Sequence, residues 1–217
     1  MSGAQPGRDT RVVGAAGAVA AALFIALFRL KRLGPLDFWA WLALNIVVVV
    51  AMSFVLDRGY ARRLREDLGS GLARKIVLGI ATAAALYGVF ALGRIVALRI
   101  FPFAAAGIGN VYALKAGAPA LRIVLLIGLV IGPGEELFWR GFFQERTGAT
   151  TSPVLGFALT ALLYTAVHLP SGNLMLILAA AVCGVFWGWL YLRFRSPVLN
   201  MISHALWDLA VFVVFPF

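Results

Sequence analysis

Apart from arginines at the outermost two positions of a segment, the apolar segments of this sequence hold seven charged residues or histidines, and all but one of them fall in its C-terminal half. An ionisable side chain in such a segment is costly to bury unless it faces a cavity or another polar group, so each one is a candidate for function. These residues are Arg94, Glu135, Glu136, Arg140, His168, His204 and Asp208. We interpret Arg94, near the end of its segment, as a residue whose charge extends to the membrane surface.

The stretch GPGEELFWRG places two acids and a base within two turns of one predicted helix. Glu136 and Arg140 are four residues apart, which puts them on one helix face in the order that favours an ion pair. We interpret this pair as a structural brace, because the arginine reduces the cost of burying the carboxylate. Glu135 lies about 100° further round the helix, has no local partner, and is therefore available for proton transfer.

Two other segments repeat the four-residue spacing. Tyr164 and His168 share one helix face, and Asn200, His204 and Asp208 form a line down another helix. A single histidine in a membrane helix often makes only a helix–helix hydrogen bond. Two histidines together with a spare glutamate indicate a functional site instead.

The heights of these residues in the membrane follow from counting along the chain. A hairpin folded at the polar turn GATTSP brings His168 to the height of Glu135. His204 reaches the same height if the hairpin tip, near Gln144, projects from the bilayer by about 12 Å at 1.5 Å per residue. We therefore predict one pocket that holds Glu135, His168 and His204 and opens toward the N-terminal side of the membrane.

The composition is that of an integral membrane protein. The chain has 217 residues, of which 62% are hydrophobic and 13% charged, whereas soluble domains are about 45–50% apolar. The net charge of +10 could indicate nucleic acid. However, the basic residues are scattered between apolar segments and form no stripe, so we expect membrane lipid as their partner and no nucleic acid.

The apolar runs predict an all-α fold, a polytopic transmembrane bundle of about seven to eight spans. Seven runs cover residues 12–30, 38–56, 76–98, 121–143, 153–168, 174–192 and 198–215. The polar stretch 57–75 is expected to form an interfacial or cytoplasmic helix. Glycine and proline interrupt residues 99–120, so we expect a loop or a partly re-entrant segment there, and a short membrane helix in it would be the eighth.

All spans are expected to belong to one membrane domain. Residues 1–120 would hold the N-terminal helices and a cytoplasmic loop, and residues 121–217 the core that carries the site. Lys and Arg are more frequent on the side that holds the N-terminus. The positive-inside rule then predicts a multi-pass protein of the cell's inner or plasma membrane with a cytoplasmic N-terminus.

The site motifs resemble those of the family that groups CAAX prenyl proteases with bacteriocin-processing and immunity proteins (CPBP, also called Abi). That family is marked by Glu-Glu-x-x-x-Arg, by Phe-x-x-x-His, and by His-x-x-x-Asn or Asp. The corresponding stretches here are EELFWRG, YTAVH and HALWD, in that order on three successive predicted helices. The resemblance covers about residues 121–210.

The resemblance implies an intramembrane endopeptidase that hydrolyses a peptide bond with a glutamate-activated water. Glu135 would be the general base, and His168 would help to hold the water. Glu136 and Arg140 would shape the surroundings of the base. A carboxylate within hydrogen-bond reach of a water can take its proton during attack on a carbonyl.

In the same family pattern, His204 and the residue at 208 would stabilise the oxyanion. Two positions depart from the commonest form of the motifs. Tyr164 replaces Phe and adds a hydroxyl that needs a partner. Asp208 replaces Asn, and an ionised Asp cannot donate to an oxyanion. We therefore expect Asp208 either to stay protonated or to orient His204.

A metal ion is a further possibility for this site. Glu135, His168, His204 and Asp208 are residue types that bind zinc together with a water. The sequence has no His-Glu-x-x-His motif, so the pattern does not require a metal. We expect no obligatory cofactor, with zinc as the alternative.

The expected partner is a protein or peptide substrate that is associated with the membrane or lipidated. One alternative function is a non-catalytic membrane scaffold or bacteriocin-immunity protein on the same fold. Another is a transporter or proton relay, which intramembrane carboxylates and histidines also fit. The sequence shows no internal repeat to favour a transporter.

Overall fold

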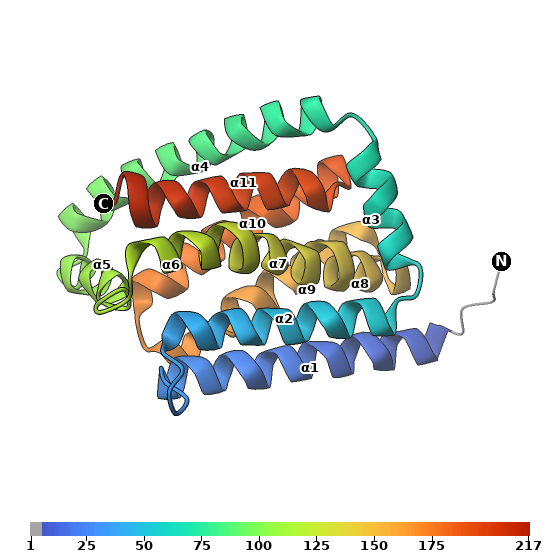
Figure 1. The fold of residues 1–217 in the computed structure, drawn as a ribbon, viewed down its shortest axis with the longest axis horizontal. Helices are drawn as coiled ribbons and strands as arrows, with labels where there is room; N and C mark the ends of the chain where they lie inside the picture. The colour runs from blue at the N-terminus through green and yellow to red at the C-terminus, as the bar shows by residue number, and fades with distance from the viewer. Residues whose placement is uncertain (1–5) are drawn as a thin grey trace.

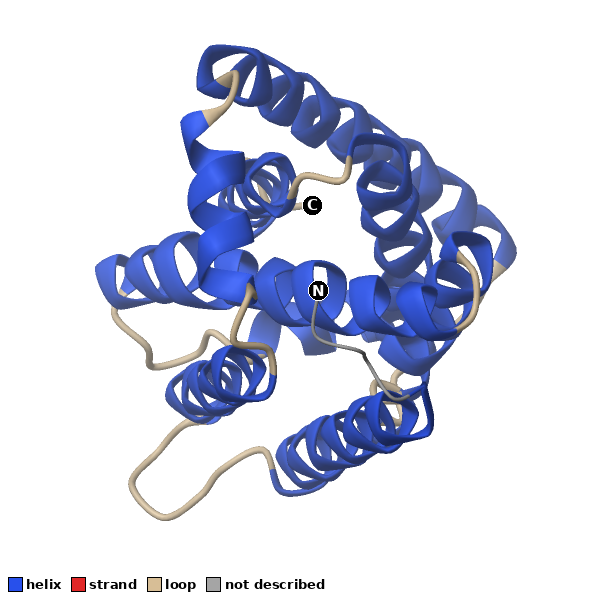
Figure 2. Cartoon of the chain, turned by 90° about the vertical axis from the view of Figure 1, so that its right-hand side faces the viewer, coloured by secondary structure: helices blue, strands red, loops and turns tan. Residues whose placement is uncertain are grey.

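The computed structural model describes residues 6–217, and their side chains from residue 10 onward. Over this part of the chain the structure consists of helices joined by short loops, without a strand (Figures 1 and 2). This confirms the predicted all-α fold.

Six helices are long and apolar enough to cross a membrane, by their length and composition. The labelled helices that form these spans are α1 (Pro6–Leu30), α2 (Phe38–Leu56), α4 (Leu72–Ile100), α9 (Pro153–Ala166), α10 (Leu174–Phe194) and α11 (Pro197–Leu209). α9 is followed by the short 3-10 helix η3 (Leu169–Ser171), and α11 by the π-helical turn η4 (Ala210–Val214). These helices correspond to six of the seven predicted spans and confirm a multi-pass helical bundle.

Four of the long helices begin at side-chain caps. The side chains of Asp37, Ser152, Asn173 and Ser196 accept hydrogen bonds from backbone N–H groups in the first turn of α2, α9, α10 and α11. Such caps satisfy donors that have no partner within the helix. A proline follows both serine caps, and it suits the first helical position because its fixed φ matches the helix.

The predicted span 121–143 is a continuous helical run, but it is not a regular α-helix. It passes through α6 (Ala120–Leu125), η1 (Leu126–Ile131), α7 (Gly132–Glu135), η2 (Glu136–Gln144) and α8 (Glu145–Thr150), where η1 and η2 are π-helical. Pro133 lacks a backbone N–H and its ring crowds the preceding turn of an α-helix, which accounts for a widened turn just before it. The site residues Glu135 and Glu136 lie at the junction between the two helix types.

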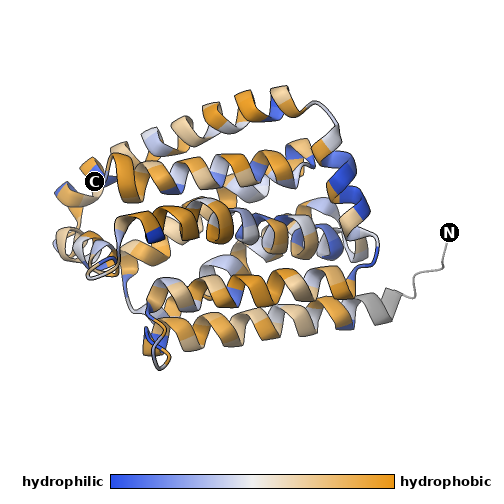
Figure 3. Ribbon diagram, viewed as in Figure 1, coloured by the Kyte–Doolittle hydropathy of each residue, from blue (hydrophilic) through white to orange (hydrophobic). Residues whose placement is uncertain are grey.

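Two short helices close the ends of the bundle. α3 (Tyr60–Gly69) lies at one end, as predicted for the polar stretch 57–75, and it carries the largest group of hydrophilic residues in Figure 3. α5 (Ala104–Ala113) lies at the opposite end (Figure 1). At 10 residues α5 is too short to span. Residues 99–120, expected to form a loop or a partly re-entrant segment, therefore hold a short helix that is not an eighth span.

Glycines let other elements approach the run that carries the site. A Cβ on Gly132 would lie 3.2 Å from the backbone nitrogen of Ala205 in α11. A Cβ on Gly141 would collide with the ring and hydroxyl of Tyr60, which donates a 2.7 Å hydrogen bond to the Leu137 carbonyl. The absence of these side chains therefore allows α11 and α3 to pack directly against the central run.

Candidate active site

A cavity of about 390 Å³ lies inside the bundle, and most of the predicted site residues line it. Glu135 reaches it from α7, His168 from the end of α9, and His204 and Asp208 from α11. The other lining residues are mainly aliphatic and aromatic. The fold therefore brings acids and imidazoles from three helical segments to one apolar chamber of a size typical of ligand sites.

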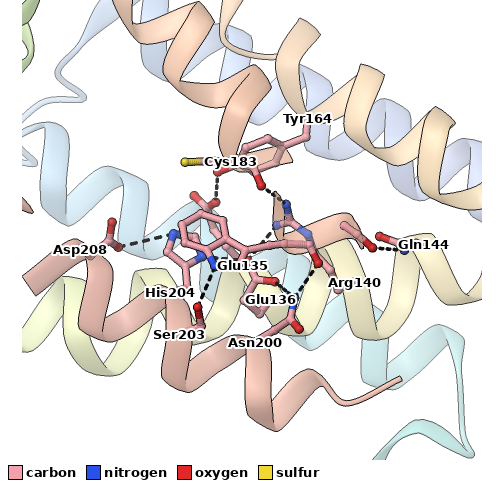
Figure 4. Close-up of polar contacts among 12 residues, drawn as sticks. Glu135, Glu136, Arg140, Gln144, Tyr164, Cys183, Asn200, Ser203, His204 and Asp208 are labelled. Atoms are coloured by element: carbon pink, nitrogen blue, oxygen red, sulfur yellow. Dashed lines mark hydrogen bonds and ion pairs between the residues drawn. The ribbon is translucent and has the colours of Figure 1, made fainter. Parts of the chain in front are cut away.

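Glu136 lies behind the cavity wall in a fully buried hydrogen-bond network (Figure 4). Arg140 donates to its carboxylate at 2.8 Å, and the Nδ1 of His204 lies 2.7 Å from the same oxygen. Asn200 donates to the other oxygen at 3.0 Å. A buried carboxylate is stable only when such donors replace water. The predicted Glu136–Arg140 pair is thus present, and it also positions His204.

Arg140 is itself held from several sides. Its side chain is fully buried, and its guanidinium lies over the rings of Tyr164 and Trp187 at 4.8 and 5.8 Å. It also donates to the Cys183 carbonyl at 3.4 Å. Contacts with ring faces and a carbonyl stabilise a cation that water does not reach. These contacts tie the central run to α9 and α10.

Glu135 has a partner that the sequence spacing did not reveal. The Tyr164 hydroxyl donates a 2.7 Å hydrogen bond to its carboxylate (Figure 4). The expectation that Glu135 has no local partner on its own helix holds, and its partner comes from α9. The hydroxyl by which Tyr164 departs from the family motif finds its acceptor on the candidate base. One carboxylate oxygen of Glu135 remains without a hydrogen bond in the described part of the chain.

His168 presents one ring nitrogen to the cavity. Its Nδ1 lies 2.7 Å from the carbonyl oxygen of Tyr164. Because a carbonyl only accepts, Nδ1 carries the hydrogen, and Nε2 is the nitrogen left for a ligand. Phe28 packs against the imidazole with ring centroids 5.0 Å apart. The ring is thus fixed in orientation at the end of α9.

His204 is fixed in a similar way. Its Nδ1 donates to Glu136, and its Nε2 lies 3.6 Å from an Asp208 oxygen, a charge contact longer than a hydrogen bond. Trp187 stacks on the imidazole with centroids 3.6 Å apart, and its indole nitrogen donates to Ser203. Glu136 therefore holds the ring by hydrogen bonding more directly than Asp208 does.

The direction of the cavity differs from the prediction. Its lining includes Phe28 at the end of α1, Phe38 and Trp39 at the start of α2, and Tyr112 on α5. These elements lie at the end of the bundle opposite α3 and the start of α1 (Figure 1). The predicted opening toward the N-terminal side is therefore wrong, because the chamber extends toward α5.

Two further interpretations change with the structure. Arg94 lines the cavity, so its side chain is part of the chamber wall and not only an anchor at the membrane surface. Gln144, expected near a projecting hairpin tip, is buried and donates a 2.9 Å hydrogen bond to the Gly188 carbonyl. A Cβ on Gly188 would lie 2.8 Å from the ring of Phe157, so this glycine lets α10 pack closely on α9.

Sequence reasoning assigned no site role to Asn200, Trp187 and Ser203. Asn200 stands one turn before His204, so its place on the site face could be found from spacing. Neither Trp187, in an apolar run, nor Ser203, beside His204, stands in a distinguishing sequence pattern. Only the packing of α10 against α11 shows that both contact the site.

Zinc was the alternative expected for Glu135, His168, His204 and Asp208. No group of three His, Cys, Asp or Glu side chains among the described residues could hold a metal ion. A structural or catalytic zinc takes at least three protein ligands. A reaction without an obligatory cofactor stays a prediction.

Comparison with known proteins identifies the segment that carries the site. Residues 117–210 match the family model described as Rce1-like, type II CAAX prenyl endopeptidase Rce1-like. No curated protein and no solved structure matches the chain. The match supports a CAAX-type intramembrane endopeptidase as the general class of activity, with a protein substrate and a multi-pass location in a membrane. Residues 117–210 thus carry the pattern of the Rce1-like type II CAAX prenyl endopeptidases, which confirms the resemblance inferred from the three motifs.

Proposed function

We propose that this protein is an intramembrane endopeptidase in which Glu135 activates a water molecule for attack on a peptide bond. The observation that carries the proposal is the convergence of Glu135, His168 and His204 on one cavity inside an apolar bundle. A base, a group to hold water and a donor for the oxyanion are what glutamate-activated hydrolysis requires.

The reaction begins with the water between Glu135 and His168. The free carboxylate oxygen of Glu135 takes a proton as the water oxygen forms a bond to the substrate carbonyl carbon. His168 Nε2 accepts a hydrogen bond from the other O–H of the water, which stays on the oxygen, and so fixes the direction of attack. Tyr164, bonded to the second oxygen of Glu135, keeps the carboxylate in place. The product of this step is a tetrahedral oxyanion.

His204 is placed to stabilise that oxyanion. With Nδ1–H donated to Glu136, a proton on Nε2 faces the cavity beside Asp208. The oxyanion accepts this hydrogen bond, and Asp208 orients the ring and attracts its positive charge. Glu135 then gives its proton to the leaving nitrogen as the carbon–nitrogen bond breaks. The base is thereby regenerated, and the reaction needs no obligatory metal.

The substrate is a protein or peptide associated with the membrane. The chamber walls are mainly apolar, so they suit apolar side chains or a lipid attached to the substrate near the cleaved bond. A polar peptide without a membrane anchor would bind more weakly, because its polar groups would lose water without gaining hydrogen-bond partners in the chamber. The proposed substrate class is therefore a membrane-associated or lipidated tail.

The test is cleavage of a library of quenched peptides by the full-length protein purified in detergent. Glu135→Gln removes the base while keeping size and hydrogen-bonding capacity, and should lower kcat by at least about 100-fold. Glu66→Gln, on the exposed face of α3, is the matched control and should leave the rate unchanged. Equal rates for wild type and Glu135→Gln would contradict the proposed mechanism.

Two other functions predict different outcomes in the same experiments. A scaffold or immunity protein would keep its cellular phenotype in the Glu135→Gln variant. A transporter or proton relay would show activity that depends on a proton gradient. Loss of both peptide cleavage and phenotype in Glu135→Gln, without dependence on a gradient, supports the protease.

A further inference from the structure

The polar helix α3 contacts the run that carries the two site glutamates. Its first residue, Tyr60, is buried, and its hydroxyl donates a 2.7 Å hydrogen bond to the carbonyl of Leu137, the residue after Glu136. Phe54 at the end of α2 stacks on the Tyr60 ring with centroids 4.9 Å apart. The start of α3 is therefore attached to η2 beside the site.

The other end of α3 is attached to α11, the helix that carries His204. The Oδ2 atom of Asp67 accepts hydrogen bonds from the Ser196 hydroxyl at 2.9 Å and from the Val198 N–H at 3.0 Å. Ser196 is the N-cap of α11, and Val198 lies in its first turn. An anion at this place satisfies a backbone donor and interacts favourably with the helix dipole. Asp67 is thus a second cap of α11, supplied by another helix.

Tyr60 and Asp67 act from one face of α3. They are seven residues apart, or two turns, and stand about 10 Å apart along the helix at 1.5 Å per residue. The Asp67 side chain is only 14% exposed, so water competes little for its hydrogen bonds. Arg62 and Glu66, by contrast, are 78% and 68% exposed. α3 crosses the end of the bundle (Figure 1) and so connects η2 with α11 there.

The same two segments meet a second time in the interior. Glu136 on η2 accepts hydrogen bonds from Asn200 and His204 on α11. His204 lies six residues after Val198, so the interior contact is about 9 Å further along α11 than the Asp67 cap. Contacts at two heights restrict both the sliding and the rotation of α11 relative to η2. The contact through α3 therefore contributes to where the His204 imidazole lies.

We propose that Tyr60 and Asp67 are positioning residues for the peptidase reaction, which hold α11 through α3 so that His204 faces the oxyanion formed at Glu135. This inference rests on the proposed peptidase function. A shift of about 1 Å in a reacting group can lower a rate by about 100-fold. Most of the cavity wall comes from other helices, so a small shift of α11 affects the chemical step more than substrate binding.

Lys75 provides a matched control on the same carboxylate. It lies in the first turn of α4, and its ammonium is 2.5 Å from Oδ1 of Asp67, the oxygen that α11 does not use. Lys75→Gln therefore removes an ion pair of Asp67 but leaves both hydrogen bonds to α11. A purely structural role of Asp67 predicts similar effects for Lys75→Gln and Asp67→Asn, whereas a positioning role predicts different ones.

The experiment measures kcat and KM for a quenched peptide with the full-length protein in detergent. Rates are divided by the amount of folded protein, and the temperature is kept below the unfolding transition of every variant. Asp67→Asn and Tyr60→Phe should each lower kcat by about tenfold and leave KM within about twofold. Asp67→Glu, which keeps the carboxylate, should recover part of the rate, and Lys75→Gln should keep the kcat of wild type.

The double variant Tyr60→Phe/Asp67→Asn tests whether α3 acts as one connection. If it does, either change alone releases α11, and the double variant should be about as slow as the slower single variant. Independent losses would instead multiply. Tyr60→Phe keeps the ring on Phe54 and carries the kinetic test by itself if Asp67→Asn does not fold.

Three results would overturn the inference: a wild-type kcat in Tyr60→Phe or Asp67→Asn, an equal loss of kcat in Lys75→Gln, or losses that multiply in the double variant. If cleavage still depended on Glu135 in such a case, the proposed function would stand and only the role of α3 would fall. If wild type showed no cleavage that depends on Glu135, both would fall.

Discussion

Two clusters of glutamates lie on the helical run from α6 to α8. Each pairs with one arginine and one tyrosine, but the first cluster is buried and the second is partly exposed. In the interior, Glu136 pairs with Arg140, and its neighbour Glu135 accepts from Tyr164 at 2.7 Å. At the hairpin end, Glu145 alone pairs with an arginine, Arg195, at 2.8 Å and accepts from Tyr191 at 2.9 Å.

Burial separates the two clusters. The side chains of Glu136 and Arg140 are both fully buried, whereas those of Glu145 and Arg195 are 23% and 48% exposed. Water competes for the outer pair and screens it, so breaking it costs little. In the interior no water replaces a lost partner, so the same contact fixes side chains and shapes the cavity. Both regions therefore contain the same kind of glutamate–arginine ion pair, and how much the pair stabilises the structure depends on how deeply it is buried.

The largest effect is expected from breaking the interior ion pair. Glu136→Gln leaves the Arg140 charge buried without its counterion, which should destabilise the protein by about 3–5 kcal/mol. Glu145→Gln breaks the outer pair and should cost at most about 1 kcal/mol. Thermal unfolding in detergent measures both. Equal losses for the two variants would show that burial does not distinguish the clusters.

A smaller effect is expected from the two tyrosines. Tyr164→Phe removes the hydrogen bond to Glu135 and should lower kcat by about tenfold with little change in KM, because a bond to a charged group contributes about 1.5 kcal/mol or more. Tyr191→Phe removes the matching bond to Glu145 outside the cavity and should leave kcat unchanged. Peptide cleavage measures both variants. If the two behave alike, Tyr164 has no role in placing the base.

The smallest effect concerns the α3 end of the bundle. Asp57 follows α2, and Arg63 on α3 donates to both of its oxygens. Burial alone would raise the pKa of Asp57, but the bonds and charge of Arg63 hold it below its ordinary 3.8. A lowered pKa gives stability that is present above about pH 4 and is lost as the pH falls through the lowered value.

The measurement is thermal unfolding of wild type and Asp57→Asn between pH 3 and pH 7. Since Arg63 is 40% exposed, the variant should lose at most about 1 kcal/mol near neutral pH. This difference should shrink below pH 4. A difference that stayed constant down to pH 3 would show that the Asp57 charge does not stabilise the α3 end.

Local patterns of sequence were sufficient for much of the fold. The predicted bounds 38–56 of the second span agree with α2, because an Asp37 cap precedes an unbroken apolar run. The four-residue spacings placed Glu136 with Arg140, and His204 with Asp208, on shared faces, and both contacts are present. Periodicity predicts such contacts because they lie within one helix.

Contacts between helices were less predictable. The Tyr164 hydroxyl reaches Glu135 across 29 positions of sequence, and no spacing rule relates two helices whose rotation about their axes is unknown. The π-helical turns around Pro133 changed that rotation further. For the same reason the place of Arg94 in the chamber wall was missed, and the chamber was expected to open toward the wrong end.

The residue types alone determined that this protein is a membrane bundle with acids and imidazoles in its C-terminal helices, because apolar runs and helical periodicity are local properties. Which of the two adjacent glutamates faces the cavity, which tyrosine holds it, and where the chamber ends were decided by how the helices pack. That packing depends on side chains distant in sequence that exclude water together, and no single segment contains it.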